Sequence, residues 1–321
     1  MGAGPSWSVM ARHDTILDRI GRTPLVRLAR LAEGLPVPVL AKCEHLNPGG
    51  SVKDRIALAI VTDAEDRGRL APGSTLVEAT AGNTGIGLAI VAASRGYGLV
   101  CVMPEKMSLD KRRALQVLGA RVVIVPNAPP DDPRNFQRHA RRLAEENGWF
   151  LVDQFANPAN PGVHERTTAV ELDEQTGGSI GAFVAGAGTG GTLTGVGRYF
   201  RSRGRRVRVV LADPAGSSLA EWVRSRRLGP DSAYLVEGIG ASAVPENFDA
   251  SVVDEAIEIP DHESFATTRR LLREEGLLVG GSSGTAVAAA LRVAARGDVG
   301  GPVVALLADS WDRYLSRDWM S

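Results

Sequence analysis

The chain has 321 residues, and its 37 Lys and Arg residues balance its 37 Asp and Glu residues. A net charge of zero argues against a protein that binds nucleic acid or a membrane surface, because both kinds of binding need a positive field. Hydrophobic residues make up 44% and charged residues 23% of the chain, which is typical of a globular protein with a substantial core.

Strands and helices are predicted to alternate along most of the chain. Continuous apolar runs predict strands at 37–44, 74–80, 98–104, 121–126, 149–155, 180–186 and 206–214. Helices are predicted at 53–67, 84–94, 108–118, 134–147, 163–175, 191–203 and 286–295. This alternation predicts an α/β protein whose parallel sheets are covered by helices on both faces.

The number of strands predicts two α/β units, because so many strands exceed one sheet of ordinary width. The best boundaries lie near Asn47 and Asp153. We therefore expect a smaller domain at 46–152 and a larger domain formed by 1–45 plus 153–321. The segment 216–262 is the least regular and is interpreted as excursions from the second unit.

Three strand-to-helix turns stand out, and in open parallel sheets such turns are where ligands bind. The threonine turn, residues 80–85, offers helix amides, Asn83 and two threonines, a set that suits a carboxylate. The glycine loop, residues 186–192, suits a phosphate because its amides can form a nest. The serine turn, residues 280–285, offers neutral hydroxyl groups. A purely structural alternative is that the threonine turn is a well-capped tight turn.

Lys53 is one of only four lysines, with Lys42, Lys106 and Lys111, in a chain whose other cationic residues are arginines. Arginine cannot form an imine with an aldehyde, so a lysine behind a Gly-Gly-Ser turn indicates a residue kept for chemistry. The alternative is an ordinary residue of a first helical turn. An aldehyde cofactor with a phosphate would use the lysine and all three turns, and that cofactor is pyridoxal phosphate. NAD would leave Lys53 and the threonine turn without a role.

The remaining side chains indicate neither a metal site nor a disulfide. The five histidines lack metal-ligand spacing. Cys43 and Cys101 lie in apolar runs and are expected to be buried free thiols, which fits a reducing, cytoplasmic setting. We find no signal-peptide pattern and no apolar stretch of the roughly 18 residues that a membrane span needs.

Several motifs occur together in one order and spacing. They are IGRTPLVRL at 20–28, SVKDR at 51–55, TAGNTGIGLA at 80–89, GTGGTLTG at 188–195, EGIG at 237–240 and GGSSGTA at 280–286. Through them nearly the whole chain resembles the cysteine synthase and cystathionine β-synthase family of pyridoxal-phosphate enzymes. PEKMS at 104–108 and LLADSWDRYLSRDWM at 306–320 are more similar to the catalytic core of the cystathionine β-synthases. The resemblance implies the tryptophan-synthase-β-like fold, pyridoxal-phosphate fold type II, with two open, mostly parallel twisted sheets flanked by helices and a mobile smaller domain.

The resemblance also implies roles for individual residues. Lys53 would bind the cofactor covalently and act as the base at the substrate Cα. Asn83 would hydrogen-bond the cofactor's 3′-oxygen, and Ser282 its pyridine nitrogen. The cofactor phosphate would be held by Gly188, Thr189, Gly190, Gly191 and Thr192. The substrate and its carboxylate would be bound by Thr80, Ala81, Gly82, Asn83, Thr84, Gln154 and Gly238.

These roles imply β-replacement on serine or an O-activated serine, O-acetyl or O-phospho, through an aminoacrylate. A thiol or sulfide acceptor would give cystathionine or cysteine. A neutral hydroxyl at the pyridine nitrogen favours loss of a β-substituent over transamination, because the ring is then a weaker electron sink. Two alternatives share the fold: a β-eliminating dehydratase or desulfhydrase, and an amine acceptor giving a β-substituted alanine such as diaminopropionate. A third alternative is a nucleotide-binding oxidoreductase or a catalytically silent subunit.

Three positions depart from the family pattern. The family usually has Ser where this chain has Ala81, so the threonine turn lacks one hydrogen-bond donor. Tyrosines common in cystathionine β-synthases are replaced by Phe155 and Ala241, where the second substrate is expected to enter. Homocysteine as the acceptor is therefore in doubt. We expect a homodimer with neither haem nor a nucleotide-responsive tail.

Overall fold

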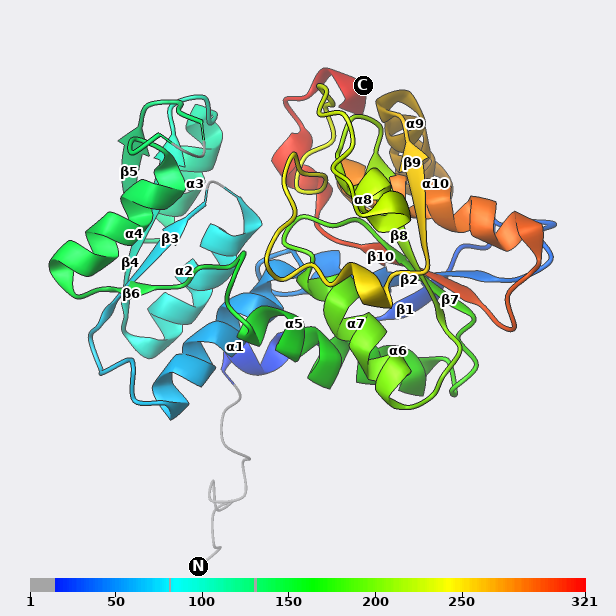
Figure 1. The fold of residues 1–321 in the computed structure, drawn as a ribbon, viewed down its shortest axis with the longest axis horizontal. Coiled ribbons are helices and arrows are strands. Elements are labelled where there is room, and N and C mark those ends of the chain that lie inside the picture. Colours follow the sequence, from blue (N-terminus) through cyan, green and yellow to red (C-terminus); the bar gives the residue numbers. More distant parts are fainter. Residues whose placement is uncertain (1–14, 81, 130–131) are drawn as a thin grey trace, which may run out of the picture.

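The computed structural model of the chain describes residues 15–80, 82–129 and 132–321 (Figure 1). Its strands form a six-stranded sheet in the order β1-β2-β10-β7-β8-β9 and a four-stranded sheet in the order β5-β4-β3-β6. Within these sheets every pair of neighbouring strands is parallel except β1 with β2. The predicted fold class, α/β with two open, mostly parallel sheets flanked by helices, is confirmed.

The strands are β1 Leu25–Arg27, β2 Val39–Cys43, β3 Thr75–Ala79, β4 Gly98–Pro104, β5 Arg121–Val125, β6 Phe150–Leu151, β7 Ala182–Ala185, β8 Arg208–Pro214, β9 Glu255–Ile259 and β10 Val303–Leu307. The α-helices are α1 Lys53–Asp66, α2 Asn83–Arg95, α3 Leu109–Val117, α4 Phe136–Asn147, α5 Ala159–Val163, α6 Ala169–Gln175, α7 Gly191–Ser202, α8 Leu219–Ser225, α9 Asp261–Glu274 and α10 Gly281–Arg296. A π-helical turn, His164–Thr168, joins α5 to α6, and 3-10 turns occupy Ile16–Arg19, Glu44–Leu46, Ala250–Val252, Trp311–Tyr314 and Asp318–Met320.

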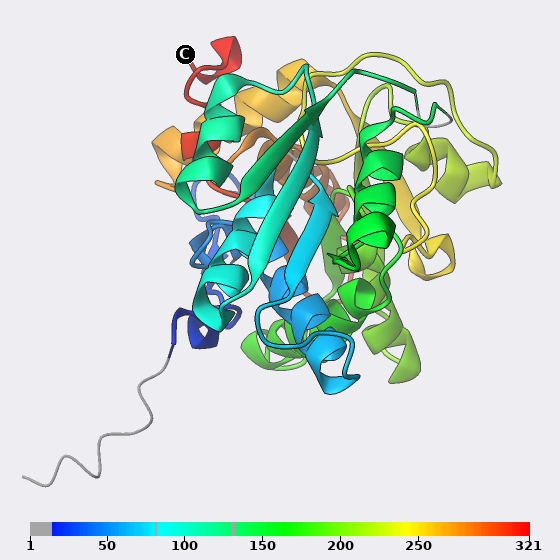
Figure 2. The ribbon, with the colours of Figure 1, turned by 90° about the vertical axis from the view of Figure 1, so that its left-hand side faces the viewer.

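Helices cover both faces of each sheet. On the larger sheet, Phe183 of β7 packs in one core cluster with residues of α7, while residues of α10 pack on the other face. On the smaller sheet, Leu76 of β3 packs with residues of α1 and α2, and Ala140 of α4 covers the opposite face. Figure 2 shows the smaller sheet with helices on either side. Within the described ranges, no helix is both long and apolar enough to cross a lipid bilayer.

Strand β10 is missing from the strands predicted by sequence, yet it lies inside the larger sheet between β2 and β7. All five of its residues are buried. A short, wholly apolar run has no period that separates a strand from a buried helix. The irregular segment 216–262 likewise holds α8 and the edge strand β9, which pairs with β8.

Two other predicted boundaries are wrong for local reasons. The strand predicted at 149–155 is only the two residues of β6, because Asp153 has φ 52° and turns the chain. The helix predicted at 286–295 begins earlier, so part of the serine turn is the first turn of α10. A Cβ on Gly284 would lie 2.0 Å from the carbonyl oxygen of Ser264 in α9. Gly284 therefore allows close helix packing rather than a loop.

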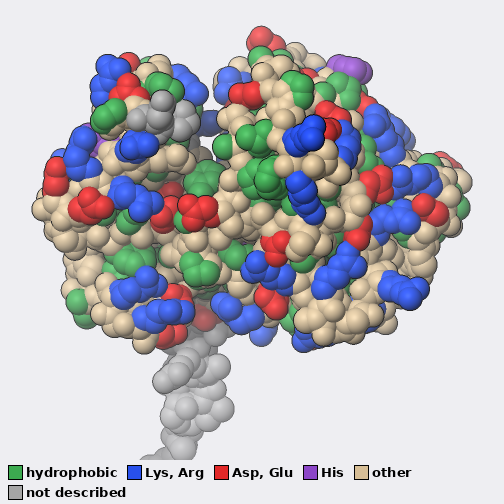
Figure 3. All heavy atoms as spheres, in the orientation of Figure 1, with side chains coloured by type: hydrophobic (Ala, Val, Ile, Leu, Met, Phe, Trp, Pro, Cys, Tyr) green, Lys and Arg blue, Asp and Glu red, His purple; other side chains and the backbone are tan. Residues whose placement is uncertain are grey.

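The turn before α1 is fixed to the end of β10 by backbone pairing. The Val52 N–H donates to Ala308 O over 2.9 Å, and the Ser310 N–H donates to Gly50 O over 3.1 Å. Helix α1 belongs to the core of the smaller sheet, whereas β10 belongs to the larger sheet. Lys53, the first residue of α1, therefore lies where the two sheets meet. Figure 3 shows a notch between the two lobes at the top of this face, and scattered charges of both signs.

A buried ionic network lies beneath this junction. Arg55 donates to Glu44 over 2.7 and 2.8 Å and to Glu171 over 2.7 and 2.8 Å. Lys42 Nζ also donates to Glu171, at Oε2, over 2.6 Å. Burial by itself would raise the pKa of Glu44, but the charge and hydrogen bonds of Arg55 prevail and lower it to about 2. The network joins α1 to β2 and α6, which belong to the larger unit.

We expect Glu44→Gln to destabilise the fold by about 3 kcal/mol at pH 7, because it removes one partner of a buried charge. The pKa of Glu44 is lower in the folded chain than when unfolded, so its contribution is present above about pH 4.3 and is lost as the pH falls toward 2. Urea unfolding at several pH values measures this. The control Asp63→Asn breaks a more exposed ion pair and should cost below ~1 kcal/mol. Equal losses in the two variants would contradict the role of the network.

Candidate active site

Lys53 lies at the N-terminus of α1 and is half-buried. Its N–H donates to Ser51 Oγ over 3.1 Å. Burial lowers the pKa of Lys53, and the negative charge of Asp309 opposes that effect. An amine with a lowered pKa is neutral more often than a solvated lysine, which suits it to act as a nucleophile or a base.

The described part of the threonine turn connects β3 to α2. Thr80 and Thr84 are buried, and the Gly82 N–H donates to Thr80 Oγ1 over 3.2 Å. Helix α2 begins at Asn83 and has no side-chain hydrogen bond at its N-cap. Its amides therefore have no side-chain competitor for an anion. Ala81 lies outside the described residues.

Gln154 joins the threonine turn to the larger unit. Thr84 Oγ1 donates to Gln154 Oε1 over 2.6 Å. The backbone oxygen of Gln154 accepts from Asn160 Nδ2 over 2.7 Å and from Asn247 Nδ2 over 2.9 Å. Asn160 Nδ2 also donates to Thr189 Oγ1 over 3.0 Å. The structure thus connects Thr84, Gln154 and the glycine loop through buried contacts.

The glycine loop is packed so tightly that three of its glycines have no room for a side chain. An added Cβ would lie 2.4 Å from Gly238 O at Gly188, 2.4 Å from Phe248 Cβ at Gly190 and 2.0 Å from Asn160 Oδ1 at Gly191. Gly190 also has φ 80° and gives α7 no side-chain cap. Apart from a long contact of 3.5 Å from the Gly191 N–H to Thr189 Oγ1, no side chain among the described residues bonds the first amides of α7, so these residues fit the phosphate of a phosphorylated cofactor. The predicted site residue Gly238 lies against this loop, where the Gly240 N–H donates to Ala187 O over 2.8 Å.

The hydroxyl of Thr192, the last residue of the glycine loop, contacts the imidazole of His164. His164 Nε2 lies 3.2 Å from Thr192 Oγ1, and its Nδ1 lies 2.9 Å from Thr168 Oγ1. Burial, helped by the charge of Arg55, lowers the pKa of His164 to about 3. A neutral imidazole accepts from one hydroxyl and donates to the other, which orients the Thr192 hydroxyl.

Asp309 is a site residue that the sequence analysis missed. It is buried, and its Oδ2 accepts from Asn83 Nδ2 and from the Tyr314 hydroxyl, each over 2.7 Å. A Cβ on Gly280, at the start of the serine turn, would lie 2.4 Å from Asp309 Oδ1. Asp309 therefore connects Asn83, Lys53 and the serine turn. An acidic residue just after a buried parallel strand would have indicated a ligand-binding position. This signal was missed because β10 was not predicted.

The serine turn supplies a buried hydroxyl in the first turn of α10. Ser282 is 5% exposed at the start of α10. A serine hydroxyl can donate to a ring nitrogen or accept from it. Within the described residues, no group of three or more His, Cys, Asp or Glu side chains is placed to hold a metal ion.

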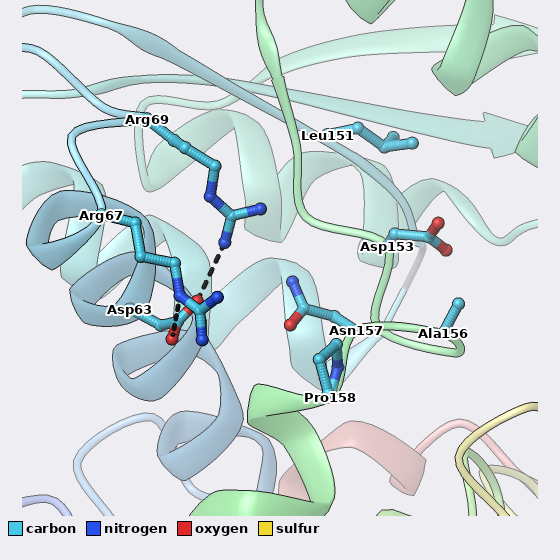
Figure 4. A pocket seen from close by; sticks show the side chains of 8 residues that line it. All are labelled: Asp63, Arg67, Arg69, Leu151, Asp153, Ala156, Asn157 and Pro158. Carbon is cyan, nitrogen blue, oxygen red and sulfur yellow. Dashed lines mark hydrogen bonds and ion pairs between the residues drawn. The ribbon is translucent and has the colours of Figure 1, made fainter.

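Figure 4 shows a surface hollow of about 270 Å³ beside α1 and the turn that follows β6. Asp63 accepts from Arg67 and from Arg69, each over 2.9 Å, so the charges at its rim largely compensate one another. The predicted site residues do not line it. Its lining residues are Asp63, Arg67, Arg69, Leu151, Asp153, Ala156, Asn157 and Pro158.

Comparison with known proteins agrees with this arrangement. Residues 16–309 match the family described as "Pyridoxal-phosphate dependent enzyme". Relatives include a cystathionine beta-synthase of Dictyostelium discoideum, 44% identical over 313 residues, and one of Oryctolagus cuniculus, 45% identical over 306 residues. These alignments cover 96% and 94% of this chain and 62% and 55% of the relatives. The chain therefore spans less than two thirds of the length of either relative.

A solved structure is similar along almost its full length. The structure of an O-ureido-L-serine synthase has a TM-score of 0.89 and 42% identity, covering 96% of this chain and 95% of that one. A lysine-to-alanine variant of O-ureido-L-serine synthase with O-ureido-L-serine bound has a TM-score of 0.86 and 41% identity. From its motifs, its fold and these matches, the chain belongs to the family of pyridoxal-phosphate dependent enzymes, and its cofactor is pyridoxal 5′-phosphate.

Proposed function

We propose that the chain catalyses β-replacement on serine or an O-activated serine, with a thiol or sulfide acceptor that gives cystathionine or cysteine. The observation that carries the proposal is the chain of contacts that links four separate turns. Thr84, Gln154, Asn160 and Thr189 connect the threonine turn to the glycine loop. Asp309 connects Asn83 and Lys53 to the serine turn. The named relatives support the same class of reaction.

The role proposed for each residue follows from the chemistry of its side chain. Bound pyridoxal phosphate supplies stabilisation of negative charge at the α-carbon of an amino acid, which lets a group leave from the β-carbon. Lys53 would bind the cofactor and move the proton at the substrate Cα, for which its lowered pKa suits it. Asn83 would hold the cofactor's 3′-oxygen and Ser282 its ring nitrogen.

The anionic groups would be held by backbone amides and neutral side chains. We assign the phosphate to Gly188, Thr189, Gly190, Gly191 and Thr192. We assign the substrate and its carboxylate to Thr80, Ala81, Gly82, Asn83, Thr84, Gln154 and Gly238. Ser282 offers a hydroxyl rather than a carboxylate, which favours loss of a β-substituent over transamination.

The identity of the acceptor substrate is the more specific part of the proposal. Relatives named cystathionine beta-synthase favour a thiol, whereas a neighbour named O-ureido-L-serine synthase favours an oxygen nucleophile such as hydroxyurea. Structural similarity supports the oxygen nucleophile, because this neighbour matches the chain over 95% of its own length. An amine acceptor and a β-eliminating lyase are the other outcomes. Release of pyruvate from O-acetylserine without any acceptor would identify the lyase.

We further propose a cytoplasmic homodimer in which residues 46–152 move as the smaller domain. The four strands of the smaller sheet all lie between residues 75 and 151. Lys111 of α3 donates to Glu237 over 2.5 Å, and Arg317 near the C-terminal end also donates to Glu237. The Lys111–Glu237 pair crosses between the two units and would close the notch of Figure 3, while Arg317 holds Glu237 from within the larger unit.

Lys53→Ala should abolish turnover, by ~10³-fold or more, and prevent covalent attachment of the cofactor. The absorbance of the purified protein, and the cofactor retained when borohydride reduction of the imine precedes denaturation, measure attachment. O-acetylserine with sulfide measures turnover. Lys106→Ala, at an exposed position, is the matched control and should retain both. Undiminished activity in Lys53→Ala would rule out the proposed mechanism.

Ala81→Ser should change kcat/KM for the donor amino acid about 5-fold or more, because it adds a hydrogen-bond donor to the threonine turn. The measurement compares serine, O-acetylserine and O-phosphoserine, each with sulfide, homocysteine and hydroxyurea. Ala71→Ser, at an exposed position, controls for an added hydroxyl elsewhere. If every pair of substrates behaves as before, the departure at Ala81 does not determine specificity.

A further inference from the structure

Glu78 is a buried carboxyl two residues before the threonine turn. It lies on β3 and is 2% exposed. The ion pairs among the described residues do not include it. Burial raises the pKa of Glu78 to about 8, so the group is mostly uncharged at neutral pH. A buried polar group of this kind costs stability unless hydrogen bonds compensate for it.

The side-chain hydrogen bond of Glu78 comes from the turn that follows β6. Gln154 Nε2 donates to Glu78 Oε1 over 3.2 Å. Within the described residues, the other carboxyl oxygen, Oε2, is buried and has no hydrogen-bond partner. Gln154 is therefore the residue through which the Glu78 carboxyl contacts the site.

This turn has an unusual backbone conformation. Asp153 has φ 52°, in the left-handed region that non-glycine residues seldom occupy. Such a conformation persists when its surroundings fix it, and it is common at functional sites. Gln154, the residue after Asp153, donates its side-chain N–H to Glu78, so Glu78 lies directly against this turn.

The side-chain amide of Gln154 is oriented from two sides. Thr84 donates to its Oε1 over 2.6 Å, while Glu78 accepts from its Nε2. An amide nitrogen carries two hydrogens, so one N–H of Gln154 is left for a further acceptor. Thr84, on the first turn of α2, lies beside it, where a carboxylate would also meet the helix amides.

We propose that Glu78 is a positioning residue that holds Gln154 so that its remaining amide N–H binds the α-carboxylate of the amino-acid substrate. This inference rests on the proposed function and deepens it. Glu78 does not touch the substrate. It acts through Gln154, by fixing the direction of the side-chain amide.

The test is binding of L-alanine and L-alaninamide to the cofactor-loaded enzyme, followed by the shift in cofactor absorbance. Alanine has the carboxylate but no β-leaving group, and alaninamide lacks the carboxylate. Glu78→Leu should raise the Kd of alanine about 10-fold and leave that of alaninamide unchanged, because one hydrogen bond to a charged group is lost. Glu78→Gln keeps an acceptor oxygen and should stay within about 2-fold of the wild type for both ligands.

Asp213 supplies a matched control. It is a fully buried carboxyl at the end of β8 that accepts the Ala220 N–H over 2.7 Å and does not contact Gln154. Asp213→Leu removes a comparable group from the other sheet and should destabilise the fold without changing the ratio of the two Kd values. In steady state, Glu78→Leu should raise the KM of the donor amino acid more than it lowers kcat, whereas Asp213→Leu should not.

The outcomes separate this inference from the proposed function. A wild-type enzyme that binds alanine no better than alaninamide would contradict the proposed carboxylate site as a whole. A wild type that prefers alanine, with the same preference in Glu78→Leu, would overturn only the role of Glu78. If Glu78→Leu does not fold, Glu78→Asp replaces it, because its carboxyl is one methylene short of Gln154. An unchanged alanine Kd in Glu78→Asp would also overturn the inference.

Discussion

The pairing of residues 50–52 with residues 308–310 is the constraint on which the candidate site depends. It fixes the turn before α1, a helix of the smaller unit, to the end of an interior strand of the larger sheet. Lys53 and Asp309 reach the same place through this one pairing, and Asn83 joins them from the smaller sheet. A parallel sheet presents its ligand-binding turns at one edge, and here two such edges face each other.

The same helix turn places two cations in opposite electrostatic settings. Arg55 is surrounded by the carboxylates of Glu44 and Glu171, and those charges raise its pKa against the effect of burial. Burial lowers the pKa of Lys53, two residues earlier, and the charge of the buried Asp309 opposes this effect. Arginine stays charged in either setting, whereas lysine can lose its proton. Arg55 therefore suits a structural ion pair and Lys53 a reactive amine, because the residue types differ and because different carboxylates lie close to each.

The sequence motifs predicted the residues of the turns far better than the contacts between them. The positions of Lys53, the glycine loop and the serine turn could be read from glycine and hydroxyl patterns, because such turns need those residues locally. Asn160 and Glu78 could not be found this way, because each contacts a partner distant in sequence and is a common residue type without a local signature. Asp309 was missed because the strand before it was not predicted. Strand β10 was missed because a five-residue apolar run indicates that a segment is buried but does not distinguish a strand from a helix.

The shortened strand β6 shows how one backbone angle can alter a site. Periodicity predicted a strand through residue 155, but the left-handed conformation of Asp153 ends pairing after Leu151 and redirects the chain toward the threonine turn. The energy of that conformation is not visible in the sequence. The residues on either side of Asp153 are held by β3, a strand of the same sheet: the Val152 N–H donates to Val77 O over 3.0 Å, and Gln154 Nε2 donates to Glu78 Oε1 over 3.2 Å.

Asn160 gives Gln154 and the glycine loop a common support. A single side-chain amide donates both to the carbonyl of Gln154 and to the hydroxyl of Thr189, and its own oxygen lies against Gly191. The side-chain entropy lost in fixing the Asn160 rotamer is therefore lost once for both contacts rather than once for each. The position of Gln154 and that of the glycine loop consequently depend on the same amide.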